Sequence, residues 1–410
     1  MKILVIGRGG RESAIVKKII KSNMVSEVYI APGNYQTGML NKCQNVNILE
    51  TNVQELQEFA FLKQIDLTIV GPESSLELGI VNKFQAKNLQ IFGPTKEACL
   101  IETSKSFAKN FMKKYHIPTA AYQEFSEVNK AITYAKNILY PHVIKYDGLA
   151  AGKGVVICHN FEQMQQEIKN MLEDNNFGHQ GKIILEEYLE GEEFTLLSLV
   201  KDNKVYPLEI SRDYKRTFDN DQGLNTGGMG AICPFDKIDA KTKEEAVNIL
   251  QATAQGLMQE KKNFTGVLYG GFIATTNGVK VIEYNARFGD PETEVVLQKL
   301  ANDLVKLILD ILNEQEIIIQ NNNKYYVGIT LAAKGYPQNY QKGILLNSYD
   351  DNGIFHMGTT KQNHKLVSNG GRVLFVSASG NTLKEARIKA YEKIELFQSE
   401  QLFYRKDIGK

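Results

Sequence analysis

The first hundred residues repeat one pattern, in which a short apolar run ends in a glycine or proline turn and a helical segment follows. Residues 3–6 are an uninterrupted apolar run, and residues 27–30, 66–70 and 91–92 are mostly apolar. An uninterrupted apolar run is typical of a strand that is buried on both faces of a parallel sheet. Strands that alternate with helices form such a sheet with helices on both sides. We therefore expect an open parallel α/β domain, with its ligands at the carboxyl ends of the strands.

The turn after the first strand, GRGGRE at residues 7–12, opens a helix. Because a helix N-terminus presents free N–H groups and a favourable dipole, Gly9 and Gly10 are predicted to bind a phosphate. A dinucleotide-binding fingerprint would need a third glycine where Glu12 stands and an acid in place of Ala31-Pro32. An NAD-dependent oxidoreductase is therefore disfavoured, whereas a tight turn without a ligand remains an alternative.

Residues 143–157, VIKYDGLAAGKGVVI, have the composition of a strand, a small-residue turn and a second strand. A turn so poor in side chains lets backbone N–H groups close over an anion, and two lysines, Lys145 and Lys153, would fix its position. We interpret this segment as a lid over nucleotide phosphates. The spacing of its glycines does not match a Walker A loop. A flexible hairpin with a surface lysine is the alternative.

The strongest indication of a metal-binding site is the segment KVIEYNARFGDPE at residues 280–292. Residues two apart on a strand project to one face, so Glu283, Asn285 and Arg287 are predicted to lie side by side. The side-chain oxygens of Glu283 and Asn285 suit Mg²⁺ or Mn²⁺. Arg287 would then lie next to phosphate or carboxylate oxygens. An ordinary amphipathic strand would explain Glu283 alone.

Other segments are polar or connecting. Residues 183–195 predict a strand that runs into an acidic turn, whose backbone would hold an adenine edge while Glu193 holds the ribose; a solvated acidic face is the alternative. Residues 211–229 predict a polar, glycine-rich loop, and a loop of this length is typically functional.

Residues 321–324 indicate a linker. The strands and the final helix beyond it, which has capping-box residues at Thr382 and Glu385, indicate a packing and substrate-closing domain.

Composition and net charge limit the classes of partner that we expect the chain to bind. The chain has 48 basic and 47 acidic residues, a net charge of +1, so neither nucleic acid nor an anionic membrane is expected to bind it. The four cysteines are scattered without metal-ligand spacing, which favours free thiols in a reducing compartment. We expect a cytoplasmic monomer that acts on small molecules.

Six segments carry a family resemblance: GGRE at residues 9–12, VGPE at 70–73, and the segments 145–154, 225–231, 283–293 and 405–409. Together they resemble the glycinamide ribonucleotide synthetases, which are the phosphoribosylamine–glycine ligases of the ATP-grasp superfamily. The resemblance covers essentially the whole chain. It implies an N-terminal phosphosubstrate-binding α/β domain, an ATP-grasp α+β domain with a glycine-rich lid, and a small C-terminal α+β domain. Their expected ranges are 1–100, 101–325 with the lid at about 120–190, and 326–410.

The resemblance implies that glycine is joined to 5-phosphoribosylamine, while ATP gives ADP and phosphate through a glycyl phosphate intermediate, in the second step of de novo purine biosynthesis. The implied catalytic residues are Lys145, Asp213 and Arg287. The implied ATP-binding residues are Lys105, Lys145, Gly148, Gly152, Lys153, Gly154, Glu186, Glu187, Leu189 and Glu193. The implied substrate-binding residues are Gly9, Gly10, Arg11, Glu12, Glu73, Asp213, Lys215, Arg287, Asp290 and Glu292. The implied metal ligands are Glu283 and Asn285.

The chain departs from the family pattern at three positions. Ser13 and Tyr214 stand where the family commonly has histidine, and Leu224 stands where it has proline. Two other functions remain open at this point: another ATP-grasp purine ligase that uses formate or bicarbonate, and a non-catalytic nucleotide-binding regulator.

Overall fold

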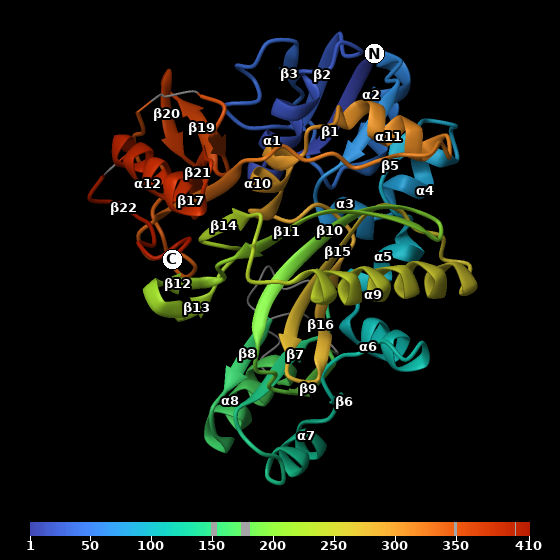
Figure 1. Ribbon diagram of the computed structural model, residues 1–410, viewed down its shortest axis with the longest axis vertical. Helices are drawn as coiled ribbons and strands as arrows, with labels where there is room; N and C mark the ends of the chain where they lie inside the picture. The colour runs from blue at the N-terminus through green and yellow to red at the C-terminus, as the bar shows by residue number, and fades with distance from the viewer. Residues whose placement is uncertain (149–153, 174–180, 348–350, 398) are drawn as a thin grey trace.

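The computed structural model describes residues 1–148, 154–173, 181–347, 351–397 and 399–410 (Figure 1). Gly152 and Lys153, which the sequence places in the lid, lie outside these ranges. No helix in the described ranges is long and apolar enough to cross a lipid bilayer.

The N-terminal domain is the predicted parallel sheet, with strand order β3-β2-β1-β4-β5. Its strands are β1 (Lys2–Gly7), β2 (Glu27–Pro32), β3 (Cys43–Asn45), β4 (Leu67–Val70) and β5 (Ile91–Phe92). Its helices are α1 (Gly10–Ile19), α2 (Val53–Lys63), α3 (Glu73–Glu77) and α4 (Ile80–Gln85). The prediction is confirmed except for β3, which is a short edge strand without an apolar run.

Two helices, α5 (Lys96–Thr103) and α6 (Lys105–Lys114), follow the parallel sheet and end shortly before Pro118. They lead to a small unit that projects at the bottom of Figure 1. Its sheet has the order β6-β9-β7-β8, and α7 and α8 pack on it. The elements are β6 (Tyr122–Phe125), α7 (Val128–Ala135), β7 (His142–Tyr146), β8 (Val155–Cys158), α8 (Phe161–Leu172) and β9 (Ile183–Glu187). This unit, called the lid unit below, has its own hydrophobic core.

The remaining chain forms one large antiparallel sheet of order β16-β15-β10-β11-β14-β17-β21-β18, with β22 paired to β17. Its strands are β10 (Glu192–Lys201), β11 (Lys204–Asp213), β14 (Gly230–Cys233), β15 (Thr265–Thr275), β16 (Gly278–Asn285), β17 (Tyr325–Ala333), β18 (Ile354–His356), β21 (Arg372–Gly380) and β22 (Leu402–Phe403). The pairing of β14 with β17 carries the sheet across the predicted linker at 321–324. The C-terminal segment therefore continues the sheet of the middle segment.

Helices and a hairpin complete this part of the chain. They are α9 (Ala240–Gln259), α10 (Glu292–Lys299), α11 (Leu304–Leu312), β19 (Thr359–Gln362), β20 (Lys365–Ser368), α12 (Leu383–Ile394) and the 3-10 turn Glu395–Phe397. The predicted cap of α12 is present, because Thr382 Oγ1 accepts a hydrogen bond from Glu385 N at 3.1 Å. The small and apolar residues Ala386, Ala390 and Ile394 form its buried stripe.

The prediction of a loop over residues 211–229 was wrong in part. Strand β11 continues to Asp213, and β12 (Arg216–Phe218) pairs with β13 (Gln222–Asn225) around a 3-10 turn at Asp219–Asp221. The sequence of the hairpin β12/β13 shows little alternation of apolar and polar residues. Polar contacts with the C-terminal residues, which are distant in sequence, stabilise the hairpin instead. Sequence periodicity therefore gave no sign of it.

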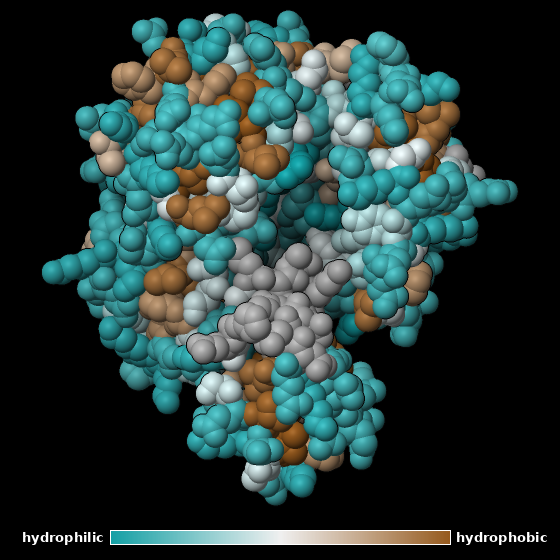
Figure 2. Space-filling model, turned by 180° about the vertical axis from the view of Figure 1, so that it is seen from behind, coloured by the Kyte–Doolittle hydropathy of each residue, from teal (hydrophilic) through white to brown (hydrophobic). Residues whose placement is uncertain are grey.

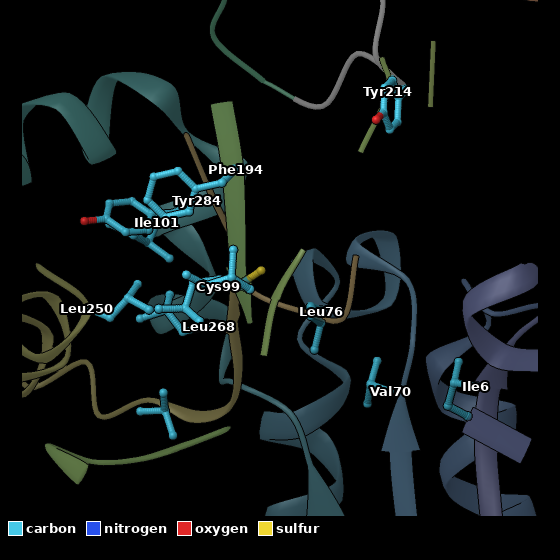
Figure 3. Close-up of a cluster of buried hydrophobic side chains, with 14 of the residues drawn as sticks. Ile6, Val70, Leu76, Cys99, Ile101, Phe194, Tyr214, Leu250, Leu268 and Tyr284 are labelled. Atoms are coloured by element: carbon cyan, nitrogen blue, oxygen red, sulfur yellow. The ribbon is translucent and has the colours of Figure 1, made fainter. Parts of the chain in front are cut away.

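The core joins the parallel sheet to the large antiparallel sheet. Figure 3 shows Ile6 and Val70 from the former in one cluster with Phe194, Leu268 and Tyr284 from the latter. Cys99 and Ile101 of α5 belong to the same cluster. This shared core fixes the carboxyl ends of the parallel strands beside the large sheet.

Candidate active site

Lysines from two elements meet at Glu186, where the lid unit faces the large sheet. Lys145 Nζ, from β7, lies 3.0 Å from Glu186 Oε2 and donates to Ile282 O at 3.1 Å. Lys109 Nζ, from α6, lies 3.1 Å from the same carboxylate oxygen. These lysine and glutamate side chains are buried, and burial lowers the pKa of Lys109 to about 8. Lys109 was not among the residues predicted from the sequence, although it lies one helical turn after Lys105.

The start of α6 holds the beginning of the predicted lid turn. Lys105 Nζ donates to Gly148 O at 2.9 Å, and burial lowers the pKa of this lysine. Asp147 Oδ1 accepts from Ser104 Oγ at 3.2 Å and from Ser106 N at 3.1 Å. Gly148 has φ = +146°, a conformation that requires glycine. On the other side of the turn, Tyr146 N donates to Gly154 O at 2.8 Å.

The predicted metal ligands lie on one side of β16. A register shift opposite β15 pairs Gly271 with Glu283 but Phe272 with Val281, so the strand carries an extra residue there. This bulge also turns Lys280 toward the side of Glu283, and Lys280 Nζ contacts Glu187 Oε1 at 2.8 Å. Without the bulge, the strict alternation of side chains along β16 would have placed Lys280 on the face opposite to Glu283.

The donor set fits a hard divalent cation. Lys215 Nζ lies 3.1 Å from Glu283 Oε1, and this lysine is the main reason that the pKa of Glu283 is lowered to about 2. Glu283 is therefore ionised at neutral pH. Asn285 Oδ1 accepts from Arg287 Nη2 at 3.4 Å. Within the described ranges, no group of three or more histidine, cysteine, aspartate or glutamate side chains is placed to hold a metal. An ion at Glu283 and Asn285 would thus complete its shell with water and phosphate oxygens.

Arg287 is held between two carboxylates. Its Nε lies 3.3 Å from Glu73 Oε2 and 3.2 Å from Glu102 Oε1. Glu102 also accepts a hydrogen bond from Ala286 N at 2.6 Å, and burial raises its pKa. Glu73 was predicted from its motif, whereas Glu102 was not predicted. An acid among the buried residues of α5, such as Cys99 and Ile101, was the available signal.

Asp213 is the last residue of β11, and Lys215, two residues further along, contacts Glu283. Burial raises the pKa of Asp213 to about 7, and Lys215 opposes this increase. Glu292 is buried nearby, and its Oε1 accepts from Thr195 Oγ1 at 3.3 Å. The neighbouring Tyr214 instead faces the C-terminus, where its hydroxyl accepts from Gly409 N at 3.1 Å. The tyrosine that replaces the common histidine therefore has a structural contact.

At the N-terminus of α1, the chain's own carboxylates occupy the free N–H groups. Gly9 N donates to Glu12 Oε2 at 2.6 Å, and Arg11 N donates to Asp290 Oδ2 at 3.2 Å. A β-carbon on Gly10 would lie 2.3 Å from Glu294 Oε1. The structure thus gathers the predicted substrate residues of both segments, although they are almost 280 residues apart in sequence.

The remaining predicted residues line the junction between the lid unit and the large sheet. Glu187 Oε1 accepts from Ala121 N at 3.1 Å. Leu189 is half-buried and Glu193 is exposed at the start of β10. Figure 2 shows a hollow in this face of the molecule, with hydrophilic residues around it. Leu224, where the family commonly has proline, is exposed on β13.

A small sheet with a buried lysine thus faces a large antiparallel sheet that carries an acid and an amide. This architecture is the one that the resemblance to the ATP-grasp ligases implies.

Comparisons with known proteins give the family. Models described as phosphoribosylglycinamide synthetase match residues 1–102 (N domain), 103–293 (ATP-grasp domain) and 326–410 (C domain). A phosphoribosylamine–glycine ligase of Halalkalibacterium halodurans is 47% identical over 100% of this chain and 96% of its own. One from Lactococcus lactis is 45% identical over 100% of this chain and 99% of its own. A crystal structure of the Thermotoga maritima ligase has a TM-score of 0.86 and 33% identity, covering 99% of this chain and 100% of that one.

The chain therefore belongs to the phosphoribosylglycinamide synthetase family and is a ligase that forms C–N bonds. Enzymes of the ATP-grasp class use ATP with a divalent metal.

Proposed function

We propose that this chain joins the carboxylate of glycine to the amine of 5-phosphoribosylamine, with glycyl phosphate as the intermediate. The observation that carries the proposal is the cluster at the junction of the sheets, in which Lys215 contacts Glu283 and Arg287 contacts Asn285, two residues further along β16. Phosphoryl transfer needs charge neutralisation and alignment more than covalent participation by the protein. A cluster of fixed charges beside a lid meets that need.

The reaction has two steps. The glycine carboxylate attacks the γ-phosphorus of ATP and releases ADP. The neutral amine of the sugar then attacks the acyl carbon and expels phosphate. We assign Lys105 and Lys145 to the ATP phosphates, because Lys145 is buried and Lys105 is half-buried at the base of the lid. Arg287 stabilises the charge on the transferred group, since Glu73 and Glu102 hold its guanidinium in place.

The glycine ammonium requires a carboxylate. Asp213 meets this requirement, because it lies at the end of β11 beside Lys215, which would face the glycine carboxylate. We place Glu292 and Asp290 near the sugar. A bound Mg²⁺ or Mn²⁺ on Glu283 and Asn285 would supply charge neutralisation for the phosphates. The segment between β7 and β8 would exclude water from the acyl phosphate.

We propose further that the enzyme acts in the cytoplasm as a monomer on these small molecules, with neither nucleic acid nor membrane as a partner. The balanced charge supports the absence of a nucleic-acid or membrane partner, and the four unpaired cysteines support a reducing compartment. We also retain the predicted division into domains, since the unit from β6 to β9 has its own sheet and core.

The test is release of ADP by the purified protein with ATP and a divalent metal. We expect release to require both glycine and phosphoribosylamine. Release that depends on formate or bicarbonate instead of glycine would contradict the proposal. Tight ATP binding without turnover, with both substrates present, would favour a regulator.

A further inference from the structure

A cavity of about 610 Å³ lies between the N-terminal sheet and the C-terminal segment, outside the cluster described above. The loops that follow β1 and β2 form one wall of this cavity. The other is formed by residues around β18, β19 and β20. Polar and charged residues from both walls include Arg8, Asn34, Asn45, Lys342, Thr359 and Lys361.

Buried hydrogen bonds fix these walls relative to each other. Asn34 Nδ2 and Ser13 Oγ each donate to His356 O at 2.9 Å. Gln36 Nε2 donates to Ile354 O at 2.9 Å. The cavity is therefore preorganised, and Ser13, where the family commonly has histidine, helps to join its walls.

The cavity has a positive lining. Arg8, Lys342 and Lys361 contribute cations, and no aspartate or glutamate is among the described residues that line it. Arg8 is partly neutralised from outside the cavity, since its Nη2 lies 2.5 Å from Glu50 Oε1. Lysine and arginine with amide and hydroxyl neighbours are the groups that recognise a phosphate monoester.

The N-terminus of α1 is a less suitable place for a dianion. Glu12 and Asp290 already accept hydrogen bonds from its N–H groups, and Glu294 lies against Gly10. A phosphate there would face these carboxylates at close range, where like charges repel strongly. The cavity adjoins this helix end, because Met357 lines the cavity and also lies next to Gly10.

We propose that this cavity binds the 5-phosphate of the amine substrate, so that the phosphate does not rest on Gly9 and Gly10. This rests on the proposed function. The sugar then extends past Met357 toward Asp290 and Arg287, and the phosphate is held away from the transferred phosphoryl group. Specificity for a phosphorylated sugar comes from Lys342 and Lys361, on the C-terminal wall.

The test compares the phosphorylated amine with ribosylamine, which lacks the phosphate. Both form in the assay from ammonia, with ribose 5-phosphate or ribose. In the double variant Lys342→Gln/Lys361→Gln we expect the KM for phosphoribosylamine to rise about tenfold or more, the usual effect of losing charge-assisted hydrogen bonds. The preference for the phosphorylated amine should fall by the same factor. The KM values for ATP and glycine should stay within about twofold of the wild type.

Both lysines are exposed, so the double variant should fold normally. The matched control is Lys87→Gln/Lys204→Gln, which removes two exposed lysines outside the cavity and should leave every KM unchanged. An active wild type whose double variant keeps the wild-type KM and preference would overturn the cavity assignment alone. A wild type without glycine-dependent ADP release would overturn the proposed function as well.

Discussion

Arg405 couples the last residues of the chain to the hairpin that follows Asp213. Its guanidinium donates to both carboxylate oxygens of Asp407, at 2.8 and 2.7 Å, and to Asp221 Oδ1 at 2.9 Å. It also donates to Arg216 O at 3.1 Å. The Arg405 side chain is 1% exposed, whereas that of Asp221 is 54% exposed. We therefore predict that Arg405→Ala destabilises the fold mainly through the buried pair with Asp407.

The magnitude follows from that pair. Removal of one partner of a buried ion pair costs about 3–5 kcal/mol, and the exposed contact with Asp221 adds ~1 kcal/mol or less. Because Asp407 keeps some solvent contact, we expect the lower end, about 3 kcal/mol. At the entropy of unfolding typical of a chain this long, that corresponds to a fall in Tm of roughly 3–4 °C.

The assay has two readouts. Calorimetry gives Tm, and steady-state kinetics gives the KM for glycine and for ATP. Because hairpin β12/β13 continues directly from Asp213 and Lys215, we expect the glycine KM to rise several-fold more than the ATP KM. Arg405→Lys should restore part of the Tm, since it keeps the charge without the bidentate geometry. Lys384→Ala, on the exposed face of α12, is the control. An Arg405→Ala protein with wild-type Tm and glycine KM would refute this reasoning.

Three further predictions concern the site. Glu283→Ala should lower kcat on the order of 10³-fold or more with the fold intact, and near-normal turnover would remove the metal assignment. Glu102→Gln should lower kcat about 10²-fold, because Arg287 loses one of its two fixing charges; an unchanged kcat would show that Glu73 suffices. The kcat/KM for glycine should rise with pH through about 7, since the pKa of Asp213 is raised to about 7 and only its ionised form holds an ammonium. Asp213→Asn should abolish this rise of kcat/KM with pH. If the rise persists in the variant, a titratable group other than Asp213 causes it.

Local patterns predicted much of the fold. The strands β1, β2 and β4 follow from mostly apolar segments, and the start of α12 follows from its capping-box residues. The common face of Glu283 and Asn285 follows from strand periodicity. The bulge that adds Lys280 to this face does not, because it depends on pairing with β15.

Contacts between distant segments were not predictable from one sequence. Lys109 and Glu102 gain their roles only when α5 and α6 pack against the lid unit and β16. The hairpin β12/β13 depends on Arg405, which is 184 residues from Asp221. Likewise, Asp290 reaches the N-terminus of α1 because the parallel and antiparallel sheets share a core.

The central claim is that the glycine carboxylate becomes an acyl phosphate at the cluster of Glu283, Lys215 and Arg287. The most direct measurement uses glycine with ¹⁸O in its carboxylate and follows the label by mass spectrometry of the phosphate released. The amine displaces phosphate at the acyl carbon, so the bridging carboxylate oxygen should leave with the phosphate as one ¹⁸O per turnover. Phosphate without the label, formed while the amide product accumulates, would contradict activation of glycine by ATP.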